Sequence, residues 1–169
     1  MSRSFRPRPR VPAAVAAALV ALGLGVATPV AAQPPASLTT VDGKTVPLAG
    51  RSGGITHLVF VARWCGAPCE QDLLAVRELA GRFARQGMRV VLVGVGKRQT
   101  QEEFVRWAGG AGMGGALVFD ADGRLEKAFG VSVLPWHVVV GSDGAVLYSA
   151  DSVPGESAVS GWIGGRSGP

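Results

Sequence analysis

Cysteine, histidine and aromatic residues are scarce in this chain of 169 residues. There are two cysteines and two histidines, and aromatic residues make up 7% of the sequence. No basic stretch with interleaved aromatic residues is present, which argues against a nucleic-acid-binding protein. The Gly-rich segment 109–115 lacks the Lys-Ser/Thr pair of a phosphate-binding loop, so its glycines do not indicate nucleotide binding. No internal repeat is visible, which leaves one ordinary domain as the expected organisation.

The first 32 residues have the pattern of a secretory signal peptide. Four arginines and no acid precede an Ala-rich apolar segment, residues 11–26, and Val30-Ala31-Ala32 is typical of a cleavage site. The alternative is a retained membrane anchor, if the signal is not cleaved. No cysteine stands at the cleavage site, since the first in the chain is Cys65, and this argues against a lipoprotein. Removing the segment leaves 13 basic against 12 acidic residues, a net charge of +1. The high overall pI therefore belongs mostly to the signal.

Both cysteines lie in the run from Phe60 to Cys69. An apolar stretch, residues 58–62, predicts a buried strand before Cys65, and a helical pattern, residues 68–85, follows the pair. The free amides and dipole of a helix N-terminus favour a thiolate. Pro68 suits the first helical position, which makes Ala67 the expected N-cap. The alternative is a structural disulfide or two buried thiols, but the strand-to-helix junction and the neighbouring Trp, Gly and Pro favour redox chemistry.

Strand and helix patterns alternate along the rest of the chain. Residues 38–48 predict a hairpin around Asp42-Gly43, and Thr100 with Glu103 predicts a capping box that opens a helix. Strands are expected at 55–62, 88–95, 116–119, 138–140 and 145–149, and helices at 68–85, 100–108, 125–129 and 156–163. This order indicates an α/β fold with helices on both faces of the sheet. The expected boundaries are a signal peptide at 1–32, a linker at 33–36, a domain at 37–163 and a flexible tail at 164–169.

Four features together carry a family resemblance. They are the Phe-x-Ala-x-Trp-Cys run ending at Cys65, Pro135 after the segment 130–134, the strand and Asp-Gly hairpin of residues 138–148, and the opening hairpin with Asp42-Gly43-Lys44. With them the chain resembles the exported TlpA/ResA-type redoxins, which are thiol–disulfide oxidoreductases. The resemblance implies a thioredoxin-like α/β fold, with a central mixed β-sheet flanked by helices and an N-terminal β-hairpin.

The resemblance also implies roles for the residues of this chain. Cys65 matches the more exposed thiol that attacks or is attacked, and Cys69 matches the cysteine that resolves the mixed disulfide. In the family the proline is cis, faces the cysteines, and presents the neighbouring backbone to the substrate by β-type pairing. The residues expected to contact substrate are Trp64, Leu134, Pro135 and Trp136. No cofactor beyond the redox-active disulfide is implied.

The chain departs from the family pattern in several places, among them Leu74 where a proline is common and Leu134 where Thr or Val is more usual before the proline. It has Cys-x-x-x-Cys instead of Cys-x-x-Cys, as if Ala67 had been inserted, so we expect the Cys65 thiolate to be less stabilised than in a Cys-x-x-Cys relative. The buried acid of plain thioredoxins falls at Val59, so that proton acceptor is missing. Asp72 occupies the common acid position three residues after Cys69, as a candidate proton relay. Its alternative role is a solvated carboxylate that the helix dipole favours.

Copper binding or delivery is a second functional class that the sequence leaves open. Cys-x-x-x-Cys with a distant histidine resembles the Sco-type copper proteins, and thiolates with imidazole suit copper. The ligands would be Cys65, Cys69 and His137. The Asp-His-Ser/Thr context of the Sco histidine is absent, and a lone histidine on a strand is more often a packed core residue. His57 lies about 25 Å along a strand from Cys65 and cannot share a ligand set with it.

Two other classes complete the alternatives. A peroxidase of the peroxiredoxin kind needs a proline and a hydroxyl residue before its cysteine, and this chain has Leu58 and Ala62 there. A redox-inert thioredoxin-like module with a structural disulfide stays open. The favoured interpretation is a periplasmic or otherwise exported monomer. It would exchange the Cys65–Cys69 disulfide with protein thiols and work with a membrane or periplasmic redox partner.

Overall fold

The structure is a computed structural model that describes residues 34–49, 54–112 and 115–163. These residues belong to one compact unit. The expected signal peptide and C-terminal tail lie outside the described residues. None of the helices in the described ranges combines the length and the apolar character of a membrane span.

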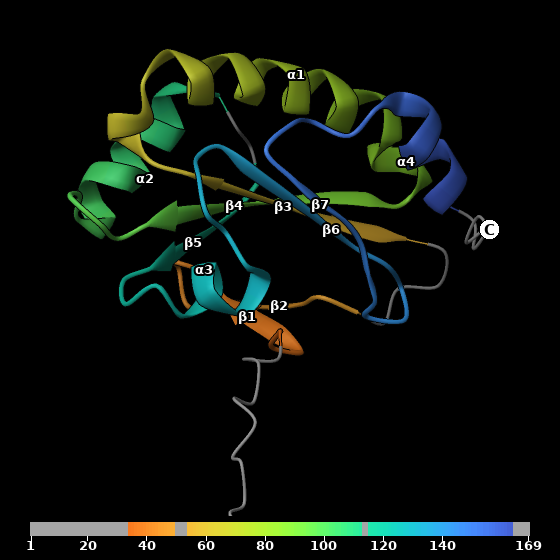
Figure 1. Ribbon diagram of the computed structural model, residues 1–169, viewed down its shortest axis with the longest axis horizontal. Helices are drawn as coiled ribbons and strands as arrows, with labels where there is room; N and C mark the ends of the chain where they lie inside the picture. The colour runs from red at the N-terminus through yellow and green to blue at the C-terminus, as the bar shows by residue number, and fades with distance from the viewer. Residues whose placement is uncertain (1–33, 50–53, 113–114, 164–169) are drawn as a thin grey trace, which may run out of the picture. The chain divides into compact units, whose positions relative to one another are not determined.

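A five-stranded mixed sheet forms the centre of the unit (Figure 1). Its strands are β3 (Ile55–Val61), β4 (Met88–Val95), β5 (Ala116–Asp120), β6 (Trp136–Val140) and β7 (Val146–Ala150), in the order β5-β4-β3-β6-β7. Strand β4 is parallel to β3 and β5, whereas β6 is antiparallel to β3 and β7. The predicted mixed sheet is confirmed, and β3 is its central strand.

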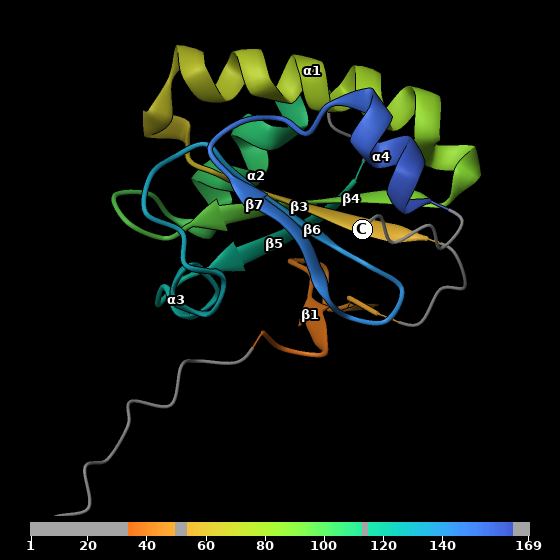
Figure 2. The ribbon, with the colours of Figure 1, turned by 45° about the vertical axis from the view of Figure 1, so that its right-hand side comes forward.

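Different elements cover the two faces of this sheet. Helices α1 (Ala67–Phe83), α2 (Gln101–Gly110) and α4 (Glu156–Trp162) pack on one face, as Figures 1 and 2 show. Helix α3 (Arg124–Phe129) and the hairpin of β1 (Ser37–Thr39) and β2 (Thr45–Pro47) pack on the other. All seven residues of β3 are buried, because its side chains alternate between these two covered faces. Packing on both faces therefore holds the end of β3 in place, and with it the start of the segment that follows.

The opening hairpin forms around Asp42-Gly43 as predicted. Gly43 adopts a φ of 78°, and the backbone amide of Lys44 donates to the Thr40 hydroxyl over 2.9 Å. Leu38 and Leu48 join the hydrophobic core from either side of the turn. The hairpin thus closes the α3 side of the sheet.

Several element boundaries differ by one or two residues from the sequence expectations, and two of them lie in β6 and α2. Strand β6 begins at Trp136, two residues early, because Trp136 already pairs with Phe60 of β3. Helix α2 continues to Gly110 after the predicted capping box, in which the Thr100 hydroxyl accepts from the Glu103 amide over 3.2 Å. Neither change moves the cysteine segment.

Candidate active site

The two cysteines bracket the N-terminus of α1. Strand β3 ends at Val61, a 3₁₀ turn spans Arg63–Cys65, and α1 starts at Ala67. The prediction that Ala67 is the N-cap is wrong: Gly66 is the N-cap, because its carbonyl accepts the helix's first bond from the Glu70 amide over 3.1 Å. Cys65 therefore lies one residue outside the capped helix, and not two.

A disulfide joins Cys65 and Cys69. The sulfur atoms are 2.12 Å apart and the Cα atoms 5.8 Å apart. Cys69 is fully buried among Val59, Val61 and Leu73, whereas Cys65 is partly exposed. An incoming thiolate therefore reaches Cys65 first, because attack on a disulfide requires access to the sulfur.

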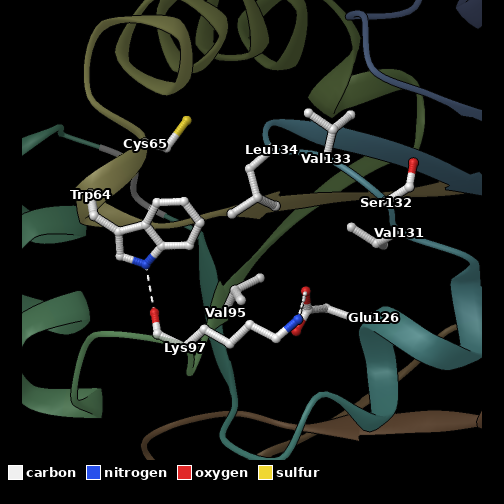
Figure 3. Close-up of a pocket in the computed structure, with 9 residues that line it drawn as sticks. All are labelled: Trp64, Cys65, Val95, Lys97, Glu126, Val131, Ser132, Val133 and Leu134. Atoms are coloured by element: carbon white, nitrogen blue, oxygen red, sulfur yellow. Dashed lines mark hydrogen bonds and ion pairs between the residues drawn. The ribbon is translucent and has the colours of Figure 1, made fainter.

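Cys65 opens onto a cleft of about 380 Å³ at one edge of the sheet (Figure 3). The Trp64 indole and the Leu134 side chain lie next to Cys65, and the indole N–H donates to the Lys97 carbonyl over 2.5 Å. The residues that line the cleft are Trp64, Cys65, Val95, Lys97, Glu126, Val131, Ser132, Val133 and Leu134. Cys65 thus borders the cleft beside one aromatic and one aliphatic side chain.

The expected substrate-contacting residues take different positions. The Leu134–Pro135 peptide bond is cis, and Pro135 is buried and does not line the cleft. Trp136 is not among the cleft residues, since its indole packs against the core on the α3 face and its N–H donates to the Ser149 hydroxyl over 3.1 Å. The structure therefore brings Trp64 and Leu134 to the sulfur and leaves Trp136 outside the cleft.

The loop between β4 and α2 holds the cysteine turn in place. The Gln99 side chain accepts from the Arg63 amide over 2.9 Å and donates to the Val95 carbonyl over 2.6 Å. The Arg98 guanidinium lies over the Trp64 ring, 5.5 Å from its centroid. These contacts fix the indole at the mouth of the cleft although 40% of the Trp64 surface is exposed.

Sequence reasoning missed the charged pair in the cleft, Lys97 and Glu126. Their side chains are 3.7 Å apart, and the exposed fractions are 72% for Lys97 and 13% for Glu126. The position of Lys97 could have been predicted from the sequence, because Lys97 follows strand β4 and the carboxyl ends of parallel strands meet at one edge of a sheet. The position of Glu126 could not have been predicted, since the orientation of the short helix α3 decides where its side chain lies.

A polar chain runs from α1 into the sheet behind the cysteines. Asp72 Oδ2 lies 2.9 Å from His137 Nε2, and His137 Nδ1 lies 3.1 Å from His57 Nε2. Both imidazoles are fully buried. Burial lowers the pKa of His57 to about 3, with the neighbouring His137 adding to the effect. Burial also lowers the pKa of His137, which the Asp72 carboxylate partly opposes.

The hydrogen bonds that join Asp72, His137 and His57 bear on two expectations from the sequence. Asp72 is bound to His137, so it is more than a solvated first-turn carboxylate. Both ring nitrogens of His137 are engaged in hydrogen bonds, and the described residues contain no group of three His, Cys, Asp or Glu side chains that could hold a metal ion. Cys65, Cys69 and His137 are therefore not brought together as a copper ligand set.

The family model described as AhpC/TSA family matches residues 30–149. The chain belongs to this family. A curated relative is the thiol-disulfide oxidoreductase ResA of Geobacillus thermodenitrificans strain NG80-2, which is 28% identical over 109 residues. That match covers 64% of this chain and 61% of the relative, so the chain spans about three fifths of the relative's length.

Solved structures show the same fold. StoA from Bacillus subtilis has 18% sequence identity and a TM-score of 0.60, over 76% of this chain and 98% of that one. A secreted Mycobacterium tuberculosis disulfide oxidoreductase homologous to E. coli DsbE has 18% identity and a TM-score of 0.58, over 74% and 91% of the two chains. The predicted thioredoxin-like fold and the redoxin resemblance are confirmed.

Proposed function

We propose that this protein is an exported thiol–disulfide oxidoreductase that exchanges its Cys65–Cys69 disulfide with protein thiols. The observation that carries the proposal is the asymmetry of the pair. One sulfur, Cys65, opens onto a cleft, whereas its partner, Cys69, is fully buried behind it. A purely structural disulfide does not need one accessible sulfur beside a cleft.

The exchange proceeds through two thiolate attacks. A substrate thiolate attacks Cys65 Sγ, the Cys65–Cys69 bond breaks, and Cys69 leaves as a thiolate that takes up a proton. A second substrate thiolate then attacks the substrate sulfur of the mixed disulfide and releases the Cys65 thiolate. Two electrons pass from the substrate dithiol to the protein. The reverse sequence reduces a substrate disulfide, and the relative reduction potentials set the direction.

The cleft supplies the contacts for the substrate chain. Trp64 and Leu134 flank Cys65, and the backbone beside cis Pro135 pairs with an extended substrate segment. Trp136 lies behind this backbone, where the hydrogen bond from its indole N–H to the Ser149 hydroxyl connects the start of β6 to β7. In this proposal Pro135 and Leu134 bind the substrate main chain, and Trp64 shields the sulfur.

Export is supported by the signal-like pattern of residues 1–32 and by the secreted neighbour in Mycobacterium tuberculosis. An exported dithiol meets an oxidising compartment, so a membrane or periplasmic redox partner must reset it after each reducing cycle. We propose that the protein acts as a monomer that alternates between this partner and its substrate. N-terminal sequencing of the mature protein tests the cleavage before Gln33, and an intact Met1 on membrane-bound protein would contradict it.

A disulfide-reduction assay with a dithiol reductant tests the activity. We expect Cys65→Ser to abolish turnover, because the accessible nucleophile is lost. When the reduced Cys69→Ser variant meets the substrate disulfide without the reductant, it should accumulate a mixed disulfide, since no second protein thiol resolves it. Wild-type activity in both variants would overturn the proposal and leave a redox-inert module.

A further inference from the structure

The two charged residues of the cleft differ in how far they are exposed. Lys97, in the loop after β4, has 72% of its side chain exposed, whereas Glu126, in α3, has 13%. Figure 3 shows the pair across the cleft from Cys65, with the Leu134 and Val95 side chains drawn between them. The carboxylate is therefore a largely buried part of the cleft wall, and the ammonium approaches it from the solvent side.

Glu126 lacks the hydrogen bonds that a buried carboxylate needs. Its Oε2 atom faces Gly123, where an added Cβ would meet it at 3.3 Å, and has no hydrogen-bond partner among the described residues. Its Oε1 atom lies 3.7 Å from Lys97 Nζ, longer than the charge-assisted hydrogen bonds of about 2.7–2.9 Å. Leaving a charged group unsatisfied in this way costs more free energy than leaving a neutral one. The cleft wall thus holds an acceptor that the folded chain does not satisfy.

This acceptor adjoins the segment that we propose to pair with the substrate. The Val131 amide donates to the Glu126 carbonyl over 2.8 Å, and the cleft lining continues from Val131 to Leu134, which lies next to Cys65. Because an extended chain advances about 3.3 Å per residue, a substrate lying along residues 131–134 spans about 10 Å. A substrate whose cysteine meets the Cys65 sulfur therefore brings the residue two or three positions away to Glu126.

A basic side chain is the substrate group that fits this position. Lysine and arginine supply N–H donors together with a positive charge, and such hydrogen bonds are roughly twice as strong as those between neutral groups. Lys97 does not block the exchange, since its side chain is mostly exposed and such an ion pair contributes little. The substrate cation replaces it at Oε1, so the carboxylate keeps a positive partner throughout. An acidic side chain would instead meet a second negative charge.

The other acidic residues around the cysteines are placed differently. Asp72 is hydrogen-bonded to a buried histidine, and the Glu103 carboxylate accepts from the N-cap amide of α2. Glu70 and Glu102 are exposed and lie outside the cleft lining. Among the described residues that line the cleft, Glu126 is thus the acid that faces a bound substrate.

We propose that Glu126 determines substrate specificity: it binds a lysine or arginine side chain that the substrate carries two or three residues from its reactive cysteine. The inference rests on the proposed function, because it names the kind of segment that the cleft accepts. Lys97 occupies the carboxylate in the free protein and leaves it when the substrate cation binds. Substrates with a basic side chain at this position therefore react faster than those with a neutral or acidic one.

Peptides that differ in one side chain test the proposal. Each peptide has a single cysteine in a disulfide with a coloured aromatic thiol, and carries Lys, Gln or Glu at the second or third position on either side of that cysteine. The reduced protein attacks the peptide sulfur through Cys65 and releases the aromatic thiolate, which is the better leaving group. At low salt we expect the wild-type rate to be about tenfold higher with Lys than with Gln at one or more of these positions, and lowest with Glu.

Three variants assign the preference to its cause. Glu126→Gln should bring the Lys and Gln peptides to equal rates. Lys97→Ala should enlarge the preference, because the substrate cation no longer competes with a lysine of the protein. Glu102→Gln is the matched control, since it removes an exposed carboxylate outside the cleft lining, and it should keep the wild-type preference. The ratio of the Lys and Gln rates is compared within each protein, so that a general change in the reactivity of Cys65 cancels.

The outcomes separate this inference from the proposed function. Equal rates with the Lys, Gln and Glu peptides in the wild type would overturn the inference. So would a preference for Lys that Glu126→Gln retains, since another acid would then cause it. Failure of the reduced wild-type protein to release the aromatic thiolate from any of the peptides would instead contradict the proposed function.

Discussion

Gly66 directly follows Cys65 and caps α1 with a φ of 65°. With a ψ of −140°, this positive-φ conformation lies in a region populated mainly by glycine and costs a residue with a Cβ about 1–3 kcal/mol, although a Cβ at Gly66 would meet no atom within 4 Å. We therefore expect Gly66→Ala to lower the free energy of unfolding by about 1 kcal/mol through backbone strain alone. Urea unfolding of the oxidised protein measures this change.

The same helix offers a matched control at Gly81. It lies exposed within α1, and a Cβ there also meets nothing within 4 Å. Gly81→Ala should raise the free energy of unfolding by about 0.5–1 kcal/mol, because alanine favours the helical backbone. Equal effects of the two substitutions would show that the turn at Gly66 does not require glycine.

The elements of this fold were predictable from local patterns. The hairpin around Asp42-Gly43, the apolar strands and the Thr100–Glu103 capping box depend on residues close together in the sequence, and each is confirmed. The N-cap of α1 was not predictable, because Pro68 is compatible with either of the first two helical positions. The backbone angle of Gly66 decides between them.

The site was predictable only in part, since tertiary packing decides the rest. The Cys65–Cys69 pair and Trp64 follow each other along the chain, so their proximity was expected. The approach of His57 to His137 depends on the register between β3 and β6, where Val59 faces His137. These histidines lie 80 positions apart in the sequence, and no sequence pattern predicts that they are in contact.

Lys97 is expected to attract negatively charged reagents into the cleft. Lys97→Ala should slow the reaction of Cys65 with an anionic disulfide reagent severalfold at low salt, because Glu126 would then be the uncompensated charge. The difference should fade at about 1 M salt, where the screening length falls to about 3 Å. Stability should change by less than about 1 kcal/mol, since Lys97 is largely exposed.

The control for this experiment is Lys127→Ala, which removes an exposed positive charge from α3 outside the cleft lining. It should react with the anionic reagent at nearly the wild-type rate. A neutral disulfide reagent should not distinguish Lys97→Ala from the wild type. Equal slowing of both reagents would point to a change in cleft shape and contradict the electrostatic explanation.

The buried histidines make stability depend on pH. An unfolded histidine takes up a proton below about pH 6.5, whereas His57 stays neutral in the native protein down to its lowered pKa of about 3. The unfolded state therefore binds more protons in this window, and the free energy of unfolding falls as the pH falls. Between pH 7 and 5 we expect His57 alone to account for a loss of about 2 kcal/mol.

Urea unfolding at pH 7 and pH 5 measures this loss. The double variant His57→Leu/His137→Leu should lose less stability between the two pH values than the wild type, by about 2 kcal/mol or more, because the lowered pKa of His137 acts in the same direction. The comparison uses the change with pH, so a general destabilisation of the variant does not affect it. Parallel losses in both proteins would show that the histidines are charged in the native state.

Removing Ala67 should bring Cys65 closer to the start of α1. The deletion converts Cys-x-x-x-Cys to Cys-x-x-Cys, and the free amides of the first turn then point more directly at the Cys65 sulfur. Because these amides stabilise a thiolate, alkylation of Cys65 near neutral pH should become faster and its midpoint should move to lower pH. The measurement is the pH dependence of alkylation in a Cys69→Ser background, with and without Ala67. An unchanged or higher midpoint would show that Gly66, as the cap, already aims the helix amides at Cys65.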